Sequence, residues 1–165
     1  PTGNLRGGKY SLYEAGTRVP FITYWKGSIK PGKSNAIISQ VDWLSSLSTI
    51  TDSIITNLDS ENHMDLLLGK VKEGRSDLVL EATSRTAYRR GDWVLIPPYP
   101  GPKMFMTKGI ETGNGEKFQL YNLVDDASQQ NNLAEKMPEK RDEMMASFEA
   151  IVGDTYKNTS KLSFD

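Results

Sequence analysis

The fold of this chain is decided by its most regular stretch, Thr86-Ala87-Tyr88-Arg89-Arg90-Gly91-Asp92-Trp93-Val94-Leu95-Ile96. Aromatic and β-branched residues, which favour strands, lie on both sides of Arg90-Gly91-Asp92. A glycine beside an aspartate is typical of a tight turn between two strands. The stretch therefore predicts a β-hairpin whose second arm is Trp93–Ile96.

Further strands are predicted on both sides of this hairpin. Asp77–Ala82 precedes it and has the composition of a short strand. After it, prolines at positions 97, 98, 100 and 102 predict a stiff loop, and Lys103–Lys108 predicts another strand. Gly113-Asn114-Gly115 then favours a tight turn into a strand over Lys117–Leu123.

A single helix follows the strands. Pro138 suits a first helical position, and Met144, Phe148 and Ile151 recur on one face of a helix over residues 138–152. Strands followed by one helix predict an α+β fold, in which an antiparallel sheet of about four strands packs against the C-terminal helix. The last dozen residues, with the glycosylation sequon Asn158-Thr159-Ser160, are interpreted as a tail.

The first seventy residues have a different pattern. Residues 1–17 form a glycine-rich loop, and Arg18–Trp25 is predicted to be a strand suited to a buried sheet. Ser39 and Asp42 fit a capping box before a helix over residues 40–50. These elements favour the end of a larger α/β sheet, so we expect one part over residues 1–70 and another over 71–165.

Composition excludes several classes of function. Charged residues make up 25% and the net charge is -1, which argues against a dedicated nucleic-acid-binding protein. No apolar run approaches the ~18 residues that a membrane span requires. The chain has no cysteine, which excludes disulfides, thiolate metal sites and a cysteine nucleophile within these 165 residues.

The N-terminal loop is the candidate site. Two adjacent glycines let the backbone approach a ligand, and Lys9 follows them directly in Leu5-Arg6-Gly7-Gly8-Lys9, a suitable place to hold a tetrahedral oxyanion. The same residues, read from Gly3, satisfy G-x-x-x-x-G-K of a nucleotide-binding P-loop. That motif continues with serine or threonine, whereas Tyr10 stands here, and it requires a preceding strand.

Four segments of the chain together have a recognisable order. They are Leu5-Arg6-Gly7-Gly8-Lys9 with Tyr13-Glu14-Ala15-Gly16-Thr17-Arg18-Val19-Pro20-Phe21, Ser39-Gln40-Val41-Asp42-Trp43-Leu44, Tyr88 to Ile96, and Gln119 to Asp126 with Gln130-Asn131-Asn132-Leu133-Ala134. In these segments and in their order the chain resembles the sulfatases of the alkaline-phosphatase-like superfamily. Departures are Ala15 for a usual glycine, Ser45-Ser46 for proline-threonine, and Ala127 for the proline of D-P.

This resemblance implies a C-terminal portion of an enzyme that hydrolyses sulfate monoesters of sugars or aryl groups. By resemblance, Lys9 contacts the substrate sulfate, and Arg6 is a candidate for neutralising a sulfate or a sugar carboxylate. The formylglycine nucleophile and calcium would come from a missing N-terminal part, so no metal or cofactor is expected in this chain. Alone it would be inactive. The expected partners are that missing part and a sulfated small molecule or glycan, and the family favours a periplasmic or secreted location.

Two other functions stay open at this point. A phosphodiesterase or phosphonate monoester hydrolase of the same superfamily would share much of the scaffold. A non-catalytic carbohydrate-binding module would need exposed aromatic residues on one face, for which the candidates are Trp25, Trp93 and Tyr99. Asp125-Asp126 with Asn131-Asn132 offers oxygens that calcium prefers, but without the spacing of an EF-hand, so a turn and a polar loop are the preferred interpretation.

Overall fold

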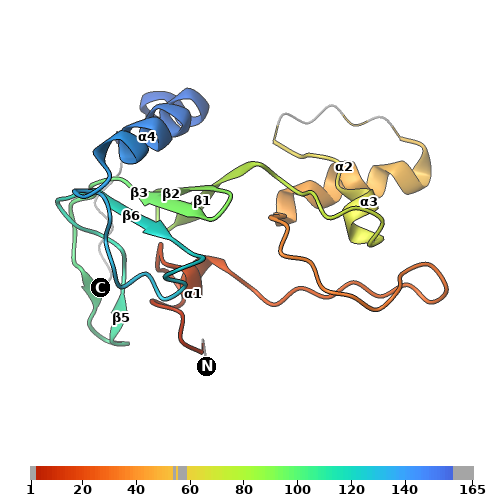
Figure 1. The fold of residues 1–165 in the computed structure, drawn as a ribbon, viewed down its shortest axis with the longest axis horizontal. Helices are drawn as coiled ribbons and strands as arrows, with labels where there is room; N and C mark the ends of the chain where they lie inside the picture. Colours follow the sequence, from red (N-terminus) through yellow and green to blue (C-terminus); the bar gives the residue numbers. More distant parts are fainter. Residues whose placement is uncertain (1–2, 54, 56–58, 158–165) are drawn as a thin grey trace. The chain divides into compact units, whose positions relative to one another are not determined.

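The computed structural model describes residues 3–53, 55 and 59–157 (Figure 1). By its contacts the chain divides into two compact units, which are described separately. Unit 1 comprises Pro1–Val19 and Val79–Asp165, and unit 2 comprises Pro20–Leu78. The division predicted at residue 70 refers to the domains of a longer protein and stays a prediction.

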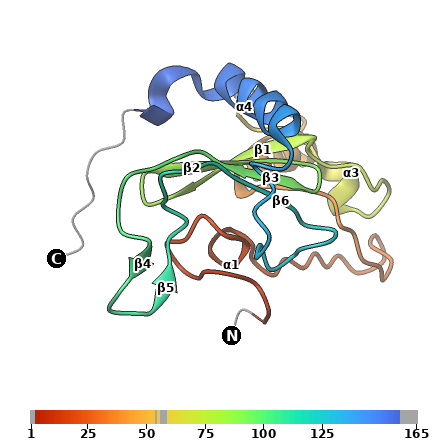
Figure 2. The same ribbon diagram turned by 60° about the vertical axis from the view of Figure 1, so that its left-hand side comes forward.

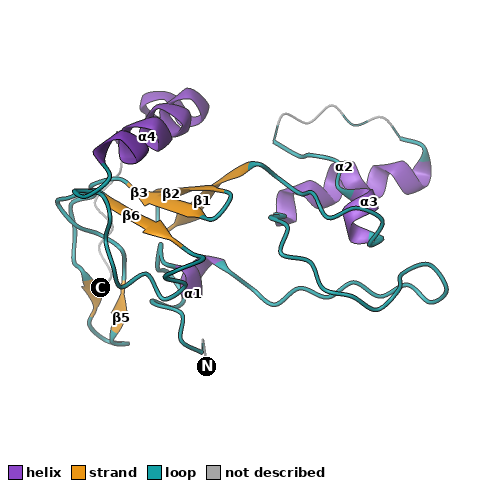
Figure 3. Ribbon diagram, in the orientation of Figure 1, coloured by secondary structure: helices purple, strands orange, loops and turns teal. Residues whose placement is uncertain are grey.

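Unit 1 is built on a four-stranded antiparallel sheet in the order β1-β2-β3-β6 (Figure 3). The predicted hairpin is confirmed, since Tyr88 pairs with Leu95 and Arg90 pairs with Trp93 across its turn. Leu95 in turn pairs with Leu120 of the last strand. The strands are β1 (Asp77–Ala82), β2 (Arg85–Arg90), β3 (Trp93–Ile96) and β6 (Gln119–Asn122).

Helix α4 (Pro138–Val152) covers one face of this sheet (Figure 2). Tyr88, Leu95 and Leu120 point toward it and form one core with Met144 and Phe148, all completely buried. The predicted antiparallel sheet with a C-terminal helix is therefore confirmed, and α4 begins and ends at the predicted residues.

The N-terminal segment covers the opposite face. Side chains of a strand alternate between faces, so Val94 and Ile96 point away from α4. They form a second core with Leu12, Tyr13 and Tyr121. A short helix, α1 (Glu14–Thr17), lies within the predicted glycine-rich loop and follows Tyr13 directly. The candidate site at residues 5–9 is thus part of unit 1.

Two predicted segments of unit 1 differ in detail. The strand expected over Lys103–Lys108 is only β4 (Met104–Phe105), which forms a small hairpin with β5 (Ile110–Glu111). The expected tail begins with a 3₁₀ helix, η3 (Gly153–Lys157), because Tyr156 packs on Phe148 with ring centroids 5.1 Å apart. The sequon Asn158-Thr159-Ser160 lies outside the described residues.

Unit 2 contains short helices and extended chain. The helix expected over residues 40–50 is present as three consecutive pieces, and the Ser39 N–H donates to Asp42 Oδ2 over 2.9 Å. A further short helix interrupts the passage expected to be irregular. The helices are η1 (Gln40–Asp42), α2 (Trp43–Ser48), η2 (Thr49–Thr51) and α3 (Met64–Leu67). No helix of the described residues is long and apolar enough to cross a membrane.

The strand predicted over Arg18–Trp25 is wrong for this structure. The segment pairs with no strand among the described residues, and Ile22 and Tyr24 are 89% and 83% exposed rather than buried. Pro20 has no N–H to donate to a ladder, and an apolar strand is stable only when a partner strand satisfies its backbone groups. Apolar composition therefore indicated a buried environment that these described residues do not provide.

Candidate functional site

Arg6 fastens the N-terminal loop to the rest of unit 1. Its Nε and Nη2 donate to the two carboxylate oxygens of Glu111 over 2.8 and 2.6 Å, and its Nη1 donates to the Gln129 carbonyl over 2.7 Å. The guanidinium carbon lies 4.1 Å from the centroid of the Tyr13 ring. These hydrogen bonds lower the pKa of the Glu111 carboxyl. Most of the Arg6 donors are thus engaged within the protein, which favours a structural role over substrate contact.

The loop is shaped by glycines that allow close backbone approach. Gly7 has φ +84°, and a Cβ there would lie 2.3 Å from Ser11 Oγ. A Cβ on Gly16 would lie 2.1 Å from the Ser11 carbonyl oxygen and 2.6 Å from that of Gly8. The same Gly8 carbonyl accepts the Ser11 N–H over 2.9 Å. Gly16 therefore packs directly against the backbone of the turn that contains Lys9, between Gly8 and Ser11.

We expect Gly16→Ala to destabilise unit 1 by about 1–3 kcal/mol. The added methyl group would meet backbone oxygens that cannot rotate away. Urea denaturation followed by circular dichroism would measure this loss. Gly115→Ala is the matched control, since its Cβ would meet only the Gln119 amide at 3.8 Å. Equal stabilities of the two variants would contradict the proposed packing role of Gly16.

Lys9 lies at the exposed end of this turn. Its ammonium is 5.0 Å from the centroid of the Tyr10 ring, and no carboxylate of the described residues forms an ion pair with it. Tyr10 has φ +79°, an unusual value for a residue other than glycine. The first helix after the loop starts only at Glu14 and has four residues, which does not fit a P-loop. Lys9 thus presents a cation to solvent on a rigid support.

The acidic loop that offered calcium-like oxygens uses them internally. Asp126 accepts the N–H groups of Gln130 and Asn131 over 3.0 and 2.7 Å and the Ser128 hydroxyl over 3.2 Å. Burial raises the pKa of Asp126, but these donors outweigh it and the pKa is lowered. Within the described residues, no group of three or more histidines or acidic side chains is arranged to hold a metal ion. The Asp126 loop therefore does not fit a calcium site.

The three aromatic residues considered for sugar binding do not form one exposed face. Tyr99 is 2% exposed, and its hydroxyl donates to the Thr86 carbonyl over 2.8 Å. Trp93 is half-buried in unit 1, whereas Trp25 belongs to unit 2. Because Tyr99 is buried, the three residues do not supply the exposed aromatic face that the carbohydrate-module interpretation requires.

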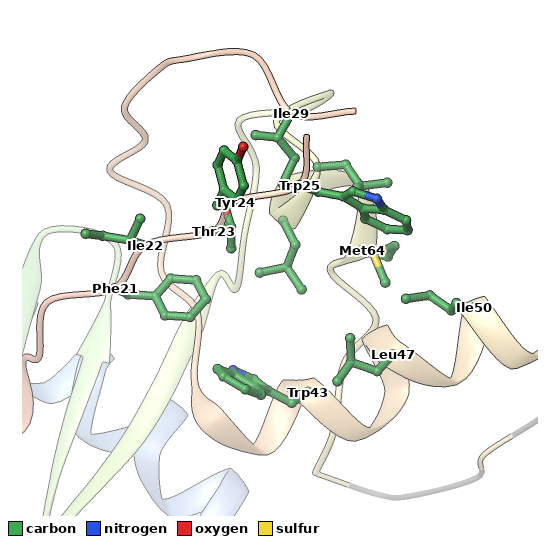
Figure 4. Close-up of a pocket in the computed structure, with 12 residues that line it drawn as sticks. Phe21, Ile22, Thr23, Tyr24, Trp25, Ile29, Trp43, Leu47, Ile50 and Met64 are labelled. Carbon is green, nitrogen blue, oxygen red and sulfur yellow. The ribbon is translucent and has the colours of Figure 1, made fainter. Parts of the chain in front are cut away.

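Unit 2 carries an apolar pocket of about 280 Å³ (Figure 4). One wall is the segment after Val19, and the other is formed by α2 and α3. Phe21 points toward Trp43, with ring centroids 5.8 Å apart. The pocket is lined by Phe21, Ile22, Thr23, Tyr24, Trp25, Ile29, Trp43, Leu47, Ile50, Met64, Leu67 and Leu68. Apolar patches of this kind are typical of surfaces that another part of a protein covers.

One known protein resembles the chain over nearly its whole length, and another resembles about half of it. It is 38% identical over 155 residues to N-acetylgalactosamine-6-O-sulfatase of Bacteroides thetaiotaomicron, which covers 92% of this chain and 30% of that protein. It is 37% identical over 79 residues to human arylsulfatase A, covering 47% of this chain and 16% of that protein.

A solved structure supports the same assignment. It is a sulfatase from Bacteroides thetaiotaomicron described in connection with the metabolism of multiple glycosaminoglycans, and it matches with a TM-score of 0.86 and 37% identity. The match covers 90% of this chain and 32% of that one. The chain thus spans less than a third of the length of the curated relatives reported above. Since the sulfatase family profile also matches residues 1–53, the chain belongs to the sulfatase family.

Proposed function

We propose that this chain is the C-terminal part of a sulfatase that hydrolyses sulfate monoesters of sugars or aryl groups. The observation that carries the proposal is the Lys9 ammonium, which forms no ion pair with the residues that the structure describes. It lies on a loop that Arg6 fastens to Glu111 and that packs closely on Gly16, in a chain of the sulfatase family. Lys9 is proposed to contact the sulfate.

The chemical role of Lys9 follows from its charge. During sulfuryl transfer the negative charge on the reacting group is redistributed over its oxygens, and a preorganised cation stabilises that charge in the transition state. The rigid support matters because a cation that is already in place requires no reorganisation during the reaction. Arg6 keeps the loop in this position through Glu111.

The nucleophile and the metal are proposed to come from the remaining part of the longer protein. The sequence has no cysteine and no C/S-x-P-x-R segment from which formylglycine could be made. Among the residues that the structure describes, no group of three or more histidines or acidic side chains could hold a metal ion, which is consistent with this proposal. In the full protein, formylglycine would supply the attacking oxygen, and calcium would supply a positive charge beside the sulfate.

The same remaining part is proposed to cover the apolar pocket of unit 2. The relatives are about three times as long as this chain, so most of their residues lie outside it. Ile22, Tyr24 and Ile50 are more than half exposed here, and burying such side chains is favourable by about 25 cal/mol per Å² of apolar surface. The exposed segment after Val19 would then gain its missing strand partner.

The substrate class and the location of the protein are proposed from its relatives and its family. One is an N-acetylgalactosamine-6-O-sulfatase, so a sulfated glycan is the proposed substrate class. A periplasmic or secreted location is proposed because the family resemblance favours it and because a sulfated glycan would be encountered outside the cytoplasm.

The experiment compares esters in the full-length protein. We expect faster hydrolysis of 4-nitrophenyl sulfate and of 6-sulfated N-acetylgalactosamine than of 4-nitrophenyl phosphate, bis(4-nitrophenyl) phosphate or a phenylphosphonate ester. The 165-residue chain alone is expected to show no turnover of any of them. Preference for a phosphorus ester would instead support a phosphodiesterase or phosphonate monoester hydrolase, and turnover by the isolated chain would contradict the proposed division of the machinery.

A further inference from the structure

We propose that Lys108, in the turn between β4 and β5, is a second cationic contact for the substrate, so that the preferred substrate carries a second anionic group beside the sulfate that is removed. The second group would be another sulfate or a sugar carboxylate. This inference rests on the proposed function and assigns its specificity.

The first observation is an aromatic ring shared by two cations. The Lys9 ammonium lies 5.0 Å and the Lys108 ammonium 6.0 Å from the centroid of the Tyr10 ring. The two nitrogens are therefore separated by at most the sum of these distances, about 11 Å, which two anionic groups of one sugar or disaccharide can span. Phe105 supports the ring edge-on, with centroids 6.1 Å apart and planes at 67°.

The second observation is that the β4–β5 hairpin is fixed to the Lys9 loop at several points. Glu111 binds Arg6, and the Leu12 N–H donates to the Thr112 carbonyl over 2.9 Å. A Cβ on Gly8 would lie 3.2 Å from the Ile110 side chain, so backbone and hairpin are in close contact. Figure 2 shows the two strands beside the N-terminal segment, on the side of the sheet opposite α4. The position of Lys108 relative to Lys9 is thus set by the fold.

The third observation concerns the backbone between them. Tyr10 adopts φ +79°, where an L side chain is strained, and the residue is 40% exposed. Such strained residues cluster at ligand-binding sites, where the surrounding structure holds them in place. Here the strained residue holds its ring centroid 5.0 Å from the Lys9 ammonium and 6.0 Å from the Lys108 ammonium.

Charge favours a ligand with two anionic groups. Within the described residues, neither Lys9 nor Lys108 forms an ion pair with a carboxylate, whereas Lys140 of α4 and Lys157 of η3 do. Two neighbouring ammonium groups repel each other, and an anion bound to each relieves that repulsion. A ligand with a single sulfate would satisfy only Lys9, so Lys108 would act on affinity for the larger substrate.

The test uses the full-length protein with Lys108→Ala, Lys108→Arg and, as a matched control, Lys136→Ala, which changes another exposed lysine of unit 1. The substrates are 4-nitrophenyl sulfate, with one anionic group, and N-acetylgalactosamine sulfated at two positions. We expect Lys108→Ala to raise KM for the doubly sulfated sugar about five- to tenfold and to change kcat less than about twofold. The aryl sulfate should be affected less than about twofold, Lys108→Arg should restore the KM, and Lys136→Ala should resemble the wild type.

Equal losses on both substrates would assign Lys108 a structural role and overturn the proposal, as would an unchanged KM. Turnover of 4-nitrophenyl sulfate by the wild type tests the proposed function separately. Calorimetric titration with the doubly sulfated sugar tests Lys108 without turnover. Equal affinities of wild type and Lys108→Ala, or no binding by the wild type, would overturn the second contact.

Discussion

Replacing Lys9 with alanine in the full-length protein is expected to lower kcat/KM for sulfate ester hydrolysis by about 10²- to 10³-fold. Removing one preorganised charge-stabilising group from an active site typically has an effect of this size. The loss should appear mainly in kcat, because the interaction with the developing charge strengthens in the transition state. Initial rates with 4-nitrophenyl sulfate over a range of concentrations would separate kcat from KM.

Two controls keep this prediction specific. Because the Lys9 side chain is exposed and its only described contact is the Tyr10 ring, Lys9→Ala should unfold at the same urea concentration as the wild type. Lys9→Arg keeps the charge and should retain more activity than alanine. A loss of less than about tenfold in Lys9→Ala, with unchanged stability, would show that the sulfate is held elsewhere.

Asp42→Ala is expected to destabilise unit 2 by about 3–5 kcal/mol, the range measured when one partner of a buried ion pair is removed. Asp42 is completely buried, and its carboxylate accepts hydrogen bonds from Arg75 Nε over 2.8 Å and Nη2 over 2.5 Å. It also accepts the N–H groups of Ser39 and Glu61 over 2.9 and 3.0 Å. These bonds join the start of the helical segment to the chain that leaves unit 2. Their loss would leave the Arg75 guanidinium, whose side chain is 10% exposed, with Glu61 as its remaining carboxylate partner among the described residues.

Urea denaturation followed by tryptophan fluorescence would measure this effect, because Trp43 adjoins Asp42 in sequence. Asp65→Asn is the matched control, since Asp65 pairs with Lys70 at the surface with both side chains 62% exposed, and its loss should cost less than about 1 kcal/mol. If both variants unfolded at the same urea concentration, the Asp42–Arg75 pair would not stabilise unit 2 more than the surface pair does.

The same pair makes unit 2 sensitive to acid. Burial raises the pKa of Asp42, but Arg75 and the two backbone donors outweigh it, and the pKa is lowered in the folded state. The stabilisation is therefore fully present above the ordinary carboxyl pKa of about 3.9 and is lost as the pH falls through the lower folded value. Asp42→Asn should remove this dependence from the acid unfolding curve.

The sequence alone determined the elements whose signals are local. The hairpin around Gly91 follows from strand-forming residues on both sides of a turn, and α4 follows from Pro138 and the apolar spacing up to Val152. These signals come from residues that lie close together in the sequence, so they can be recognised without knowing any tertiary contact. The family resemblance, carried by motifs of this kind, was also available from sequence.

Tertiary structure alone decided the roles of residues that meet partners far along the chain. The sequence makes Arg6 a candidate for substrate contact, and only the fold shows that Glu111, 105 positions away, accepts its hydrogen bonds. Lys108 had no sequence signal, because its place beside Lys9 depends on how the β4–β5 hairpin packs on Tyr10. The segment after Arg18 has the composition of a strand, but a strand needs a pairing partner, and composition does not say where that partner lies.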